Sequence, residues 1–95
     1  MHLISRKKLK EAVLRHHDLE AALDAWFRIA KRSFWQNLTG VRRTFATADV
    51  VEKWTVFNIK GNKYRLITEI NYRFRRVYIR RVLTHAEYDQ EKWKR

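Results

Sequence analysis

From Trp54 onward, apolar and polar residues alternate with a period of two, and this pattern limits the fold more than any other feature of the chain. Side chains on a β-strand point to opposite faces in turn, so the alternation predicts half-buried strands. Two segments, K-G-N-K and R-F-R-R, separate the alternating runs, and Gly61 with Asn62 favours a two-residue hairpin turn. We therefore predict two β-hairpins in series, with strands at residues 54–59, 64–72 and 77–83.

The predicted strands divide their side chains between two faces. In the second strand, one face carries Tyr64, Leu66, Thr68, Ile70 and Tyr72. In the third strand, strict alternation places Val77, Ile79, Arg81 and Leu83 together, opposite Tyr78, Arg80 and Val82. Each face mixes apolar and polar residues, which suits a sheet with helices on one side and a functional surface on the other.

Two helices are predicted before these hairpins. After a short edge strand at residues 1–4, Ser5 is a good N-cap for a helix over about residues 6–16. Asp18 is predicted to cap a second helix over about residues 19–35. Its apolar stripe consists of Leu19, Ala22, Leu23, Trp26, Phe27, Ala30 and Phe34.

The segment at residues 36–53 is less regular. Gly40 is expected to break any helical pattern there, and residues 48–51 allow a helical turn. Phe45, Val50 and Val51 are expected to pack onto the core.

The last predicted element is a helix of about ten residues from His85 to the C-terminus. Thr84 and Glu87 have the spacing of a capping box, in which each side chain accepts a hydrogen bond from the other residue's backbone. Because residues three apart share a helical face, His85 and Tyr88 are expected to be neighbours near the basic sheet. The predicted fold class is α+β, with an antiparallel sheet, two N-terminal helices on one face and a short C-terminal helix.

A chain of 95 residues is expected to form a single domain over residues 1–95. Its formal net charge of +12 is extreme for that length and calls for a polyanionic or acidic partner. Nucleic acid is the first candidate, an acidic protein the second and an anionic membrane surface the third.

The chain has no cysteine, so disulfides and thiolate metal sites are excluded and a reducing compartment is expected. No apolar run typical of a secretory signal follows the early R-K-K, and no stretch approaches the ~20 apolar residues of a membrane span. The sequence therefore predicts a cytoplasmic protein without a membrane partner.

Cations and aromatic residues are interleaved between residues 60 and 81, and Glu69 is the one carboxylate in that stretch of sequence. Cations bind phosphates and aromatic rings stack on unpaired bases, a combination typical of single-stranded RNA recognition. A solvated face would normally carry charges of both signs. The pattern favours an RNA-binding surface over that simpler interpretation.

His85 is the histidine nearest to this basic stretch in sequence. RNA carries its own nucleophile in the 2′-hydroxyl, so cleavage needs a proton acceptor, a proton donor and cations for the phosphate. Histidine can serve in either proton role near neutral pH, and arginine suits the phosphate oxygens. No metal is needed, and the adjacent His16 and His17 cannot share a helical face as ligands.

A family resemblance is carried by the order strand–helix–helix–hairpins and by two runs of sequence, V-F-N-I-K-G-N-K-Y-R-L-I and R-R-V-L-T-H-A-E-Y-D. Together they resemble the HigB-type toxins of bacterial type II toxin–antitoxin modules, within the RelE/ParE-like superfamily. The resemblance extends over essentially the whole chain. It implies the small α+β RelE/ParE-like fold.

The resemblance also implies an activity and partners. The expected activity is endonucleolytic cleavage of mRNA without a metal or other cofactor, in the 30S A site of the translating ribosome. The expected partner protein is a HigA-type helix-turn-helix antitoxin, and operator DNA would be bound only through the toxin–antitoxin complex.

The family's T-H-x-E-Y-D and N-K-Y-R segments assign candidate site residues here. His85 is the expected proton carrier, Arg65 and Lys63 the phosphate clamp with Arg80 as a further candidate, and Tyr88 a stacking or positioning group. The remaining expected RNA-binding residues are Lys60, Asn62, Tyr64, Arg73, Arg75, Arg76, Arg80 and Asp89. Two alternatives remain: a ParE-like gyrase inhibitor, and a non-catalytic RNA- or ribosome-binding module.

Overall fold

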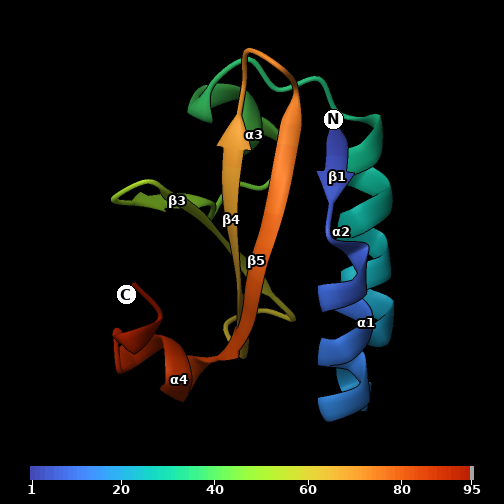
Figure 1. Ribbon diagram of the computed structural model, residues 1–95, viewed down its shortest axis with the longest axis vertical. Coiled ribbons are helices and arrows are strands. Elements are labelled where there is room, and N and C mark those ends of the chain that lie inside the picture. The colour runs from blue at the N-terminus through green and yellow to red at the C-terminus, as the bar shows by residue number, and fades with distance from the viewer. Residues whose placement is uncertain (95) are drawn as a thin grey trace.

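The computed structural model describes residues 1–94 and has an α+β fold, as predicted, built on a five-stranded sheet. Across the sheet the strand order is β1-β5-β4-β3-β2 (Figure 1). The strands are β1 (His2–Ile4), β2 (Asp49–Val51), β3 (Trp54–Ile59), β4 (Tyr64–Asn71) and β5 (Arg76–Thr84). The helices are α1 (Arg6–Arg15), α2 (Glu20–Arg32), α3 (Leu38–Thr44) and α4 (His85–Asp89), with 3₁₀ turns at His17–Leu19 and Lys92–Lys94.

The sheet is mixed rather than wholly antiparallel. β1 is an edge strand, as expected, but it pairs parallel to β5, with His2 opposite Arg76 and Ile4 opposite Tyr78. β1 leads directly into α1, and α1 packs along the rest of β5. β1 and β5 thus run in the same direction along the sheet, whereas the other neighbouring strands are antiparallel.

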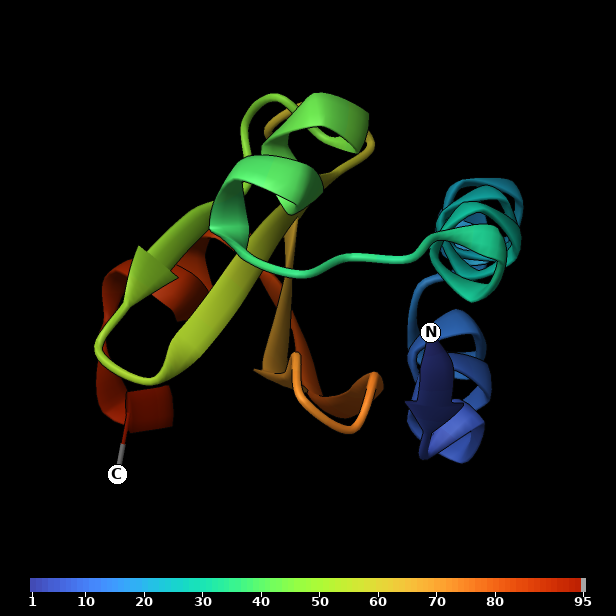
Figure 2. The same ribbon diagram turned by 90° about the horizontal axis from the view of Figure 1, so that it is seen from above.

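The two N-terminal helices pack together against one face of the sheet, as predicted (Figures 1 and 2). From α1, Leu9 and Ala12 are buried, and from α2, Leu23, Trp26 and Ala30. The ring centroids of Trp26 and Phe57 lie 5.3 Å apart in an edge-to-face arrangement. Such aromatic pairs contribute roughly 1 kcal/mol beyond the burial of their area.

A smaller apolar cluster lies on the opposite face of the sheet and holds the C-terminal segment. Trp93 is 5% exposed and packs with Val56 and Ile67, while Leu83 and Tyr88 border the cluster. The indole nitrogen of Trp93 donates to the backbone oxygen of Tyr88 at 2.9 Å. The chain end is thereby fixed on the face opposite α1 and α2.

Neither predicted N-terminal cap forms. Ser5 adopts a left-handed conformation with φ of 75° and makes no capping hydrogen bond, because the chain turns sharply there from β1 into α1. Asp18 lies in a 3₁₀ turn, α2 begins only at Glu20, and the Asp18 side chain contacts the β3–β4 loop instead. The second helix also ends at Arg32, so Phe34 lies beyond it and is 55% exposed.

Three predictions for the middle segment are wrong. Gly40 does not break a helix but lies within α3, where its backbone nitrogen donates to the side chain of the N-cap residue Asn37 at 2.9 Å. Residues 49–51 form β2 rather than a helical turn, because they pair antiparallel with the start of β3. Phe45 and Val51 pack onto apolar clusters as expected, whereas Val50 is 43% exposed.

The β3–β4 turn is longer than predicted. Ile59 pairs with Tyr64, so the loop holds the four residues between them. Positive φ values occur at Lys60 (55°) and Gly61 (67°), and not at Asn62. The longer loop leaves the Asn62 carbonyl and side chain turned toward β4.

A β-bulge in β5 changes which side chains face the core. Ile67 pairs with Arg81 but Thr68 pairs with Ile79, which leaves Arg80 as the extra residue. Val82, rather than Arg81, therefore joins Ile79 in the main core. Strict alternation, as predicted from the sequence, fails at this point.

Within residues 1–94, the structure contains no helix with the length and apolar character required to cross a membrane.

Candidate active site

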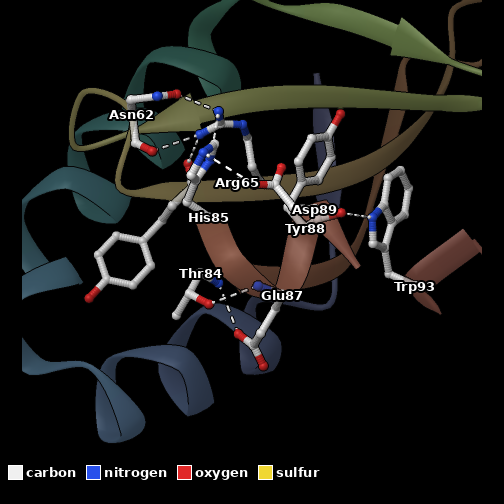
Figure 3. A network of polar contacts seen from close by, with 9 residues as sticks. Asn62, Arg65, Thr84, His85, Glu87, Tyr88, Asp89 and Trp93 are labelled. Atoms are coloured by element: carbon white, nitrogen blue, oxygen red, sulfur yellow. Dashed lines mark hydrogen bonds and ion pairs between the residues drawn. The ribbon is translucent and has the colours of Figure 1, made fainter. Parts of the chain in front are cut away.

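The site is built at the junction between β5 and α4. The backbone nitrogen of Glu87 donates to the Thr84 hydroxyl at 3.2 Å, and the Glu87 carboxylate accepts from the Thr84 backbone nitrogen at 2.9 Å (Figure 3). The predicted capping box is therefore confirmed. The His85 backbone nitrogen also donates to the Lys63 oxygen at 3.0 Å, which ties the junction to the β3–β4 loop.

α4 is shorter than the predicted ten residues. It spans His85–Asp89, and Glu91 then takes a positive φ of 59°, which ends the helical geometry. The chain turns so that Trp93 stacks on Tyr88 with ring centroids 5.2 Å apart. Burial of Trp93 against the sheet is the physical reason for this early end.

Arg65 is the charged residue at the centre of the site. It is only 8% exposed, and burial of a charge is tolerated only where the charge is well paired. Its Nη1 donates to the backbone oxygens of Asn62 at 3.0 Å and Tyr64 at 3.2 Å. Its Nη2 donates to the Asn62 side chain, and its guanidinium lies 5.3 Å from the ring centroid of Tyr88 (Figure 3). Arg65 is thus held rigidly by the loop before it.

His85 lies between Arg65 and Asp89 (Figure 3). Its Nδ1 is 3.3 Å from Arg65 Nη2, and its Nε2 is 3.4 Å from a carboxylate oxygen of Asp89. Arginine can only donate hydrogen bonds, so Nδ1 acts as the acceptor and the neutral ring carries its proton on Nε2. The partners on either side therefore select one tautomer of His85.

His85 and Tyr88 were expected to be neighbours, and Arg65 is the residue that contacts both. The Tyr88 ring packs between this guanidinium and Trp93. The His85 side chain remains 49% exposed, so a ligand in solvent can reach it.

Asp18 is a part of the site that the sequence did not indicate. Its carboxylate accepts from Lys63 Nζ at 2.8 Å, from the Tyr64 hydroxyl at 2.9 Å and from Lys60 Nζ at 3.1 Å. These hydrogen bonds, that of Lys63 first, hold the pKa of Asp18 well below its ordinary value. The same carboxylate raises the pKa of Lys63.

Tyr64 and Lys63 differ in what they expose to solvent. Tyr64 is 3% exposed and belongs to the main core, so its ring presents no stacking surface. Its burial, with the hydrogen bond to Asp18, raises its pKa. The Lys63 side chain is 60% exposed and lies beside the junction that carries His85.

The remaining predicted RNA-binding residues lie elsewhere. The β4–β5 turn holds Arg73, Arg75 and the adjoining Arg76, at the opposite end of the hairpin from Tyr64 and Thr84. Seven steps along β4 span roughly 23 Å. Arg75 lies over the exposed ring of Phe34 at 4.0 Å.

Arg80 is not part of the Arg65–His85 group either. It lies at the bulge in β5, and its Nε donates to Glu69 at 3.0 Å. Glu69 is thereby paired within the sheet, away from His85.

Within residues 1–94, no group of three His, Cys, Asp or Glu side chains is placed to hold a metal ion. The cations at the junction that can stabilise negative charge on a bound ligand are Arg65 and Lys63. A buried guanidinium, an exposed histidine with one selected tautomer and a neighbouring carboxylate form an arrangement suited to moving a proton beside a bound anion.

The small α+β fold, with its five-stranded mixed sheet, is consistent with a RelE-like toxin. The family model that matches residues 19–91 is HigB_toxin, described as the RelE-like toxic component of a toxin-antitoxin system. The chain belongs to this HigB family.

Curated relatives of the chain are named mRNA interferases. The chain is 30% identical over 92 residues to the mRNA interferase toxin HigB of Escherichia coli (strain K12). The aligned region covers 94% of this chain and 88% of that protein. The mRNA interferase HigB of Shigella flexneri gives the same values. The mRNA interferase HigB of Escherichia coli O6:H1 is 29% identical over 93 residues, covering 95% of this chain and 90% of the relative.

Proposed function

We propose that this chain is the toxin of a type II toxin–antitoxin module and that it acts as an endoribonuclease on mRNA. Family membership and the names of its relatives support this assignment. The observation that carries it is the placement of His85 between a buried arginine and a carboxylate, beside exposed lysines. The activity inhibits translation and growth.

In the proposed reaction, a phosphate of the RNA takes over Nη2 of Arg65 and releases Nδ1 of His85. The freed lone pair accepts the proton of the 2′-hydroxyl, and the 2′-oxygen forms a bond to phosphorus. The bond from phosphorus to the 5′-oxygen breaks, and that oxygen takes a proton from solvent. The products are a 2′,3′-cyclic phosphate and a 5′-hydroxyl.

Asp89 has a defined role in this scheme. When His85 accepts a proton on Nδ1, the ring becomes cationic and keeps its Nε2 proton directed at Asp89. A carboxylate in that position stabilises the cation and holds the ring orientation, as in other histidine–carboxylate pairs. Arg65 and Lys63 stabilise the charge on the phosphate.

The wider RNA-binding surface consists of Lys60, Lys63 and Asn62 on the β3–β4 loop, while Tyr88, whose ring lies between Arg65 and Trp93, positions Arg65. Asp18 holds the two lysines in the absence of RNA. Arg80 and the distal arginines at residues 73, 75 and 76 contact RNA away from the scissile bond. Cleavage needs no metal in this scheme, because the cations come from side chains.

The same proposal includes the cellular context. The toxin acts in the cytoplasm on mRNA in the 30S A site of the ribosome, and a HigA-type antitoxin neutralises it. Operator DNA is bound only through that complex. The net charge of +12 supports both an RNA target and an acidic antitoxin surface.

Purified protein tests these points together. A 5′-labelled mRNA is incubated with the toxin, with and without translating ribosomes; EDTA is added only to the reaction without ribosomes, which themselves need Mg²⁺, at a high toxin concentration. We expect cleavage with ribosomes, and slow cleavage of the free RNA that EDTA leaves unchanged. Intact mRNA in the ribosome reaction would contradict the proposed function, and cleavage of free RNA that EDTA abolishes would contradict metal independence.

A further inference from the structure

A groove lies between α1 and the part of β5 that follows its pairing with β1. It has a volume of about 450 Å³, and its lining includes Lys8, Arg15, Arg80 and Arg81. The pairing of β1 with β5 ends at Ile4 and Tyr78, so the groove begins where the edge of β5 is no longer covered by a strand. Lys8 and Arg15 were not among the residues predicted to bind RNA.

The cations converge on this groove for two separate reasons. On α1, Lys8, Glu11 and Arg15 are spaced by three and four residues, which places them on one helical face. On β5, the bulge leaves Arg80 and Arg81 together opposite Ile67. Bulges commonly redirect a side chain in this way.

The charge in this groove is not balanced. Its two carboxylates are already engaged: Glu87 accepts from the Thr84 backbone, and Glu11 lies 4.0 Å from Lys7. Within residues 1–94, Lys8, Arg15 and Arg81 make no ion pair.

The groove between α1 and α2 provides a contrast. There Arg6 and Lys10 are matched by Glu20 and Asp24 over an apolar floor. A groove with balanced charge has no preference for a polyanion, whereas the groove along β5 has one.

The groove along β5 reaches the active-site junction. Its lining includes Leu83 and Glu87, which flank the start of α4 on either side of His85. We propose that the single RNA strand that is cut at His85 continues into this groove, where Lys8 and Arg15 bind its phosphates. This inference rests on the proposed function and extends it to a named path for the strand.

The test measures the affinity of the full chain for a fluorescent, single-stranded 2′-O-methyl RNA over a range of salt concentrations. This RNA lacks the 2′-hydroxyl and cannot be cut by the proposed reaction. The variant Lys8→Ala/Arg15→Ala is compared with Lys10→Ala/Lys31→Ala, which removes the same charge from exposed positions outside the groove.

We expect the groove variant to lower the slope of log K against log salt by about 1.4, because each phosphate contact with a single strand contributes about 0.7. The matching loss of affinity is about 25-fold at 0.1 M salt, and the control variant changes much less. Equal slopes for the two variants would overturn the proposal. So would a groove variant that loses binding to poly-glutamate but keeps RNA binding, since the groove would then take an acidic protein.

Cleavage of natural mRNA on ribosomes separates this result from the proposed function. If the wild-type protein leaves mRNA intact but the slopes differ as expected, the groove binds RNA and the enzymatic proposal is wrong. If mRNA is cut but the slopes agree, the enzymatic proposal stands and the path of the strand is wrong.

Discussion

The guanidinium of Arg65 makes four hydrogen bonds within the protein, to two backbone oxygens, the Asn62 side chain and Nδ1 of His85. Because its donors are engaged within the protein, Arg65 primarily positions His85 and the β3–β4 loop. It binds phosphate only by exchanging one of these partners, and the bond to His85 is the longest of the four. This exchange couples phosphate binding to the release of the histidine lone pair.

Asp89 provides a prediction at the scale of a single residue. We expect Asp89→Asn to lower the rate of mRNA cleavage by about 10²-fold, within the usual range for a proton-transfer partner. The asparagine keeps the side-chain size but removes the charge that stabilises protonated His85. Thermal stability should change little, because the Asp89 side chain is 60% exposed.

The matched control for this variant is Glu91→Gln. Glu91 is 69% exposed and pairs with Lys94, so the substitution makes the same change in charge near the same helix. We expect it to cut mRNA at the wild-type rate. Equal rates for both variants would show that Asp89 has no part in the reaction.

At the scale of elements, α4 depends on its cap. A helix of five residues is too short to be stable alone, yet it carries His85, Tyr88 and Asp89. The capping box at its start and the burial of Trp93 after its end hold it in place. A substitution that removes either should therefore displace the side chains of the active site.

We expect Thr84→Ala to destabilise α4 by about 1 kcal/mol, the usual cost of losing an N-cap side chain. That cost corresponds to roughly fivefold in the ratio of folded to unfolded helix, so cleavage should fall, by at most that factor. Hydrogen exchange at the Asp89 amide measures the first effect, because the amide that bonds the Thr84 hydroxyl is that of Glu87 and would lose its own acceptor.

Two further variants control the cap experiment. Thr84→Ser retains a capping hydroxyl and should behave as the wild type, while Thr39→Ala removes an exposed threonine from α3. If Thr84→Ser is as impaired as Thr84→Ala, the hydroxyl is not the cause and the account of α4 is wrong.

The same elements show what the sequence could predict. The junction at Thr84 and Glu87 depends on residues three apart, so its cap was visible in the pattern. The bulge at Arg80 depends on how β5 pairs with β4, and local alternation carries no sign of it. α3 was missed because a glycine near the start of a helix costs little when Asn37 caps it.

The contacts that complete the site are long-range, and this is why they were not predicted. The residues next to Asp18 in the sequence indicate a helix cap. Its hydrogen-bond partners, however, lie more than forty positions away on the β3–β4 loop. The family resemblance identified His85 and Arg65 as candidates. Only the folded chain showed that Arg65 is buried and bonded to His85.

At the scale of the whole molecule, Asp18 links the turn before α2 to the β3–β4 loop. The folded state lowers its pKa below the ordinary value of 3.8. The unfolded chain therefore binds the proton first as the pH falls. The contribution of Asp18 to stability is present above about pH 4 and is lost below it.

We expect the melting temperature of the wild type to fall more steeply between pH 6 and pH 3 than that of Asp18→Asn, at constant ionic strength. Asp24→Asn serves as the control, because Asp24 pairs only within α2, with Arg28, among the residues described. Parallel pH curves for the wild type and Asp18→Asn would contradict this account.

The central claim is that His85 carries the proton in mRNA cleavage, and mapping of mRNA ends in cells tests it most directly. The wild type, His85→Ala and His17→Ala are expressed, the last as a control for an exposed histidine that lines a different groove. We predict new ends within messages, with 5′-hydroxyl groups, for the wild type and His17→Ala, and intact messages with normal growth for His85→Ala. Growth arrest by the wild type with intact messages, or undiminished cleavage by His85→Ala, would contradict the account.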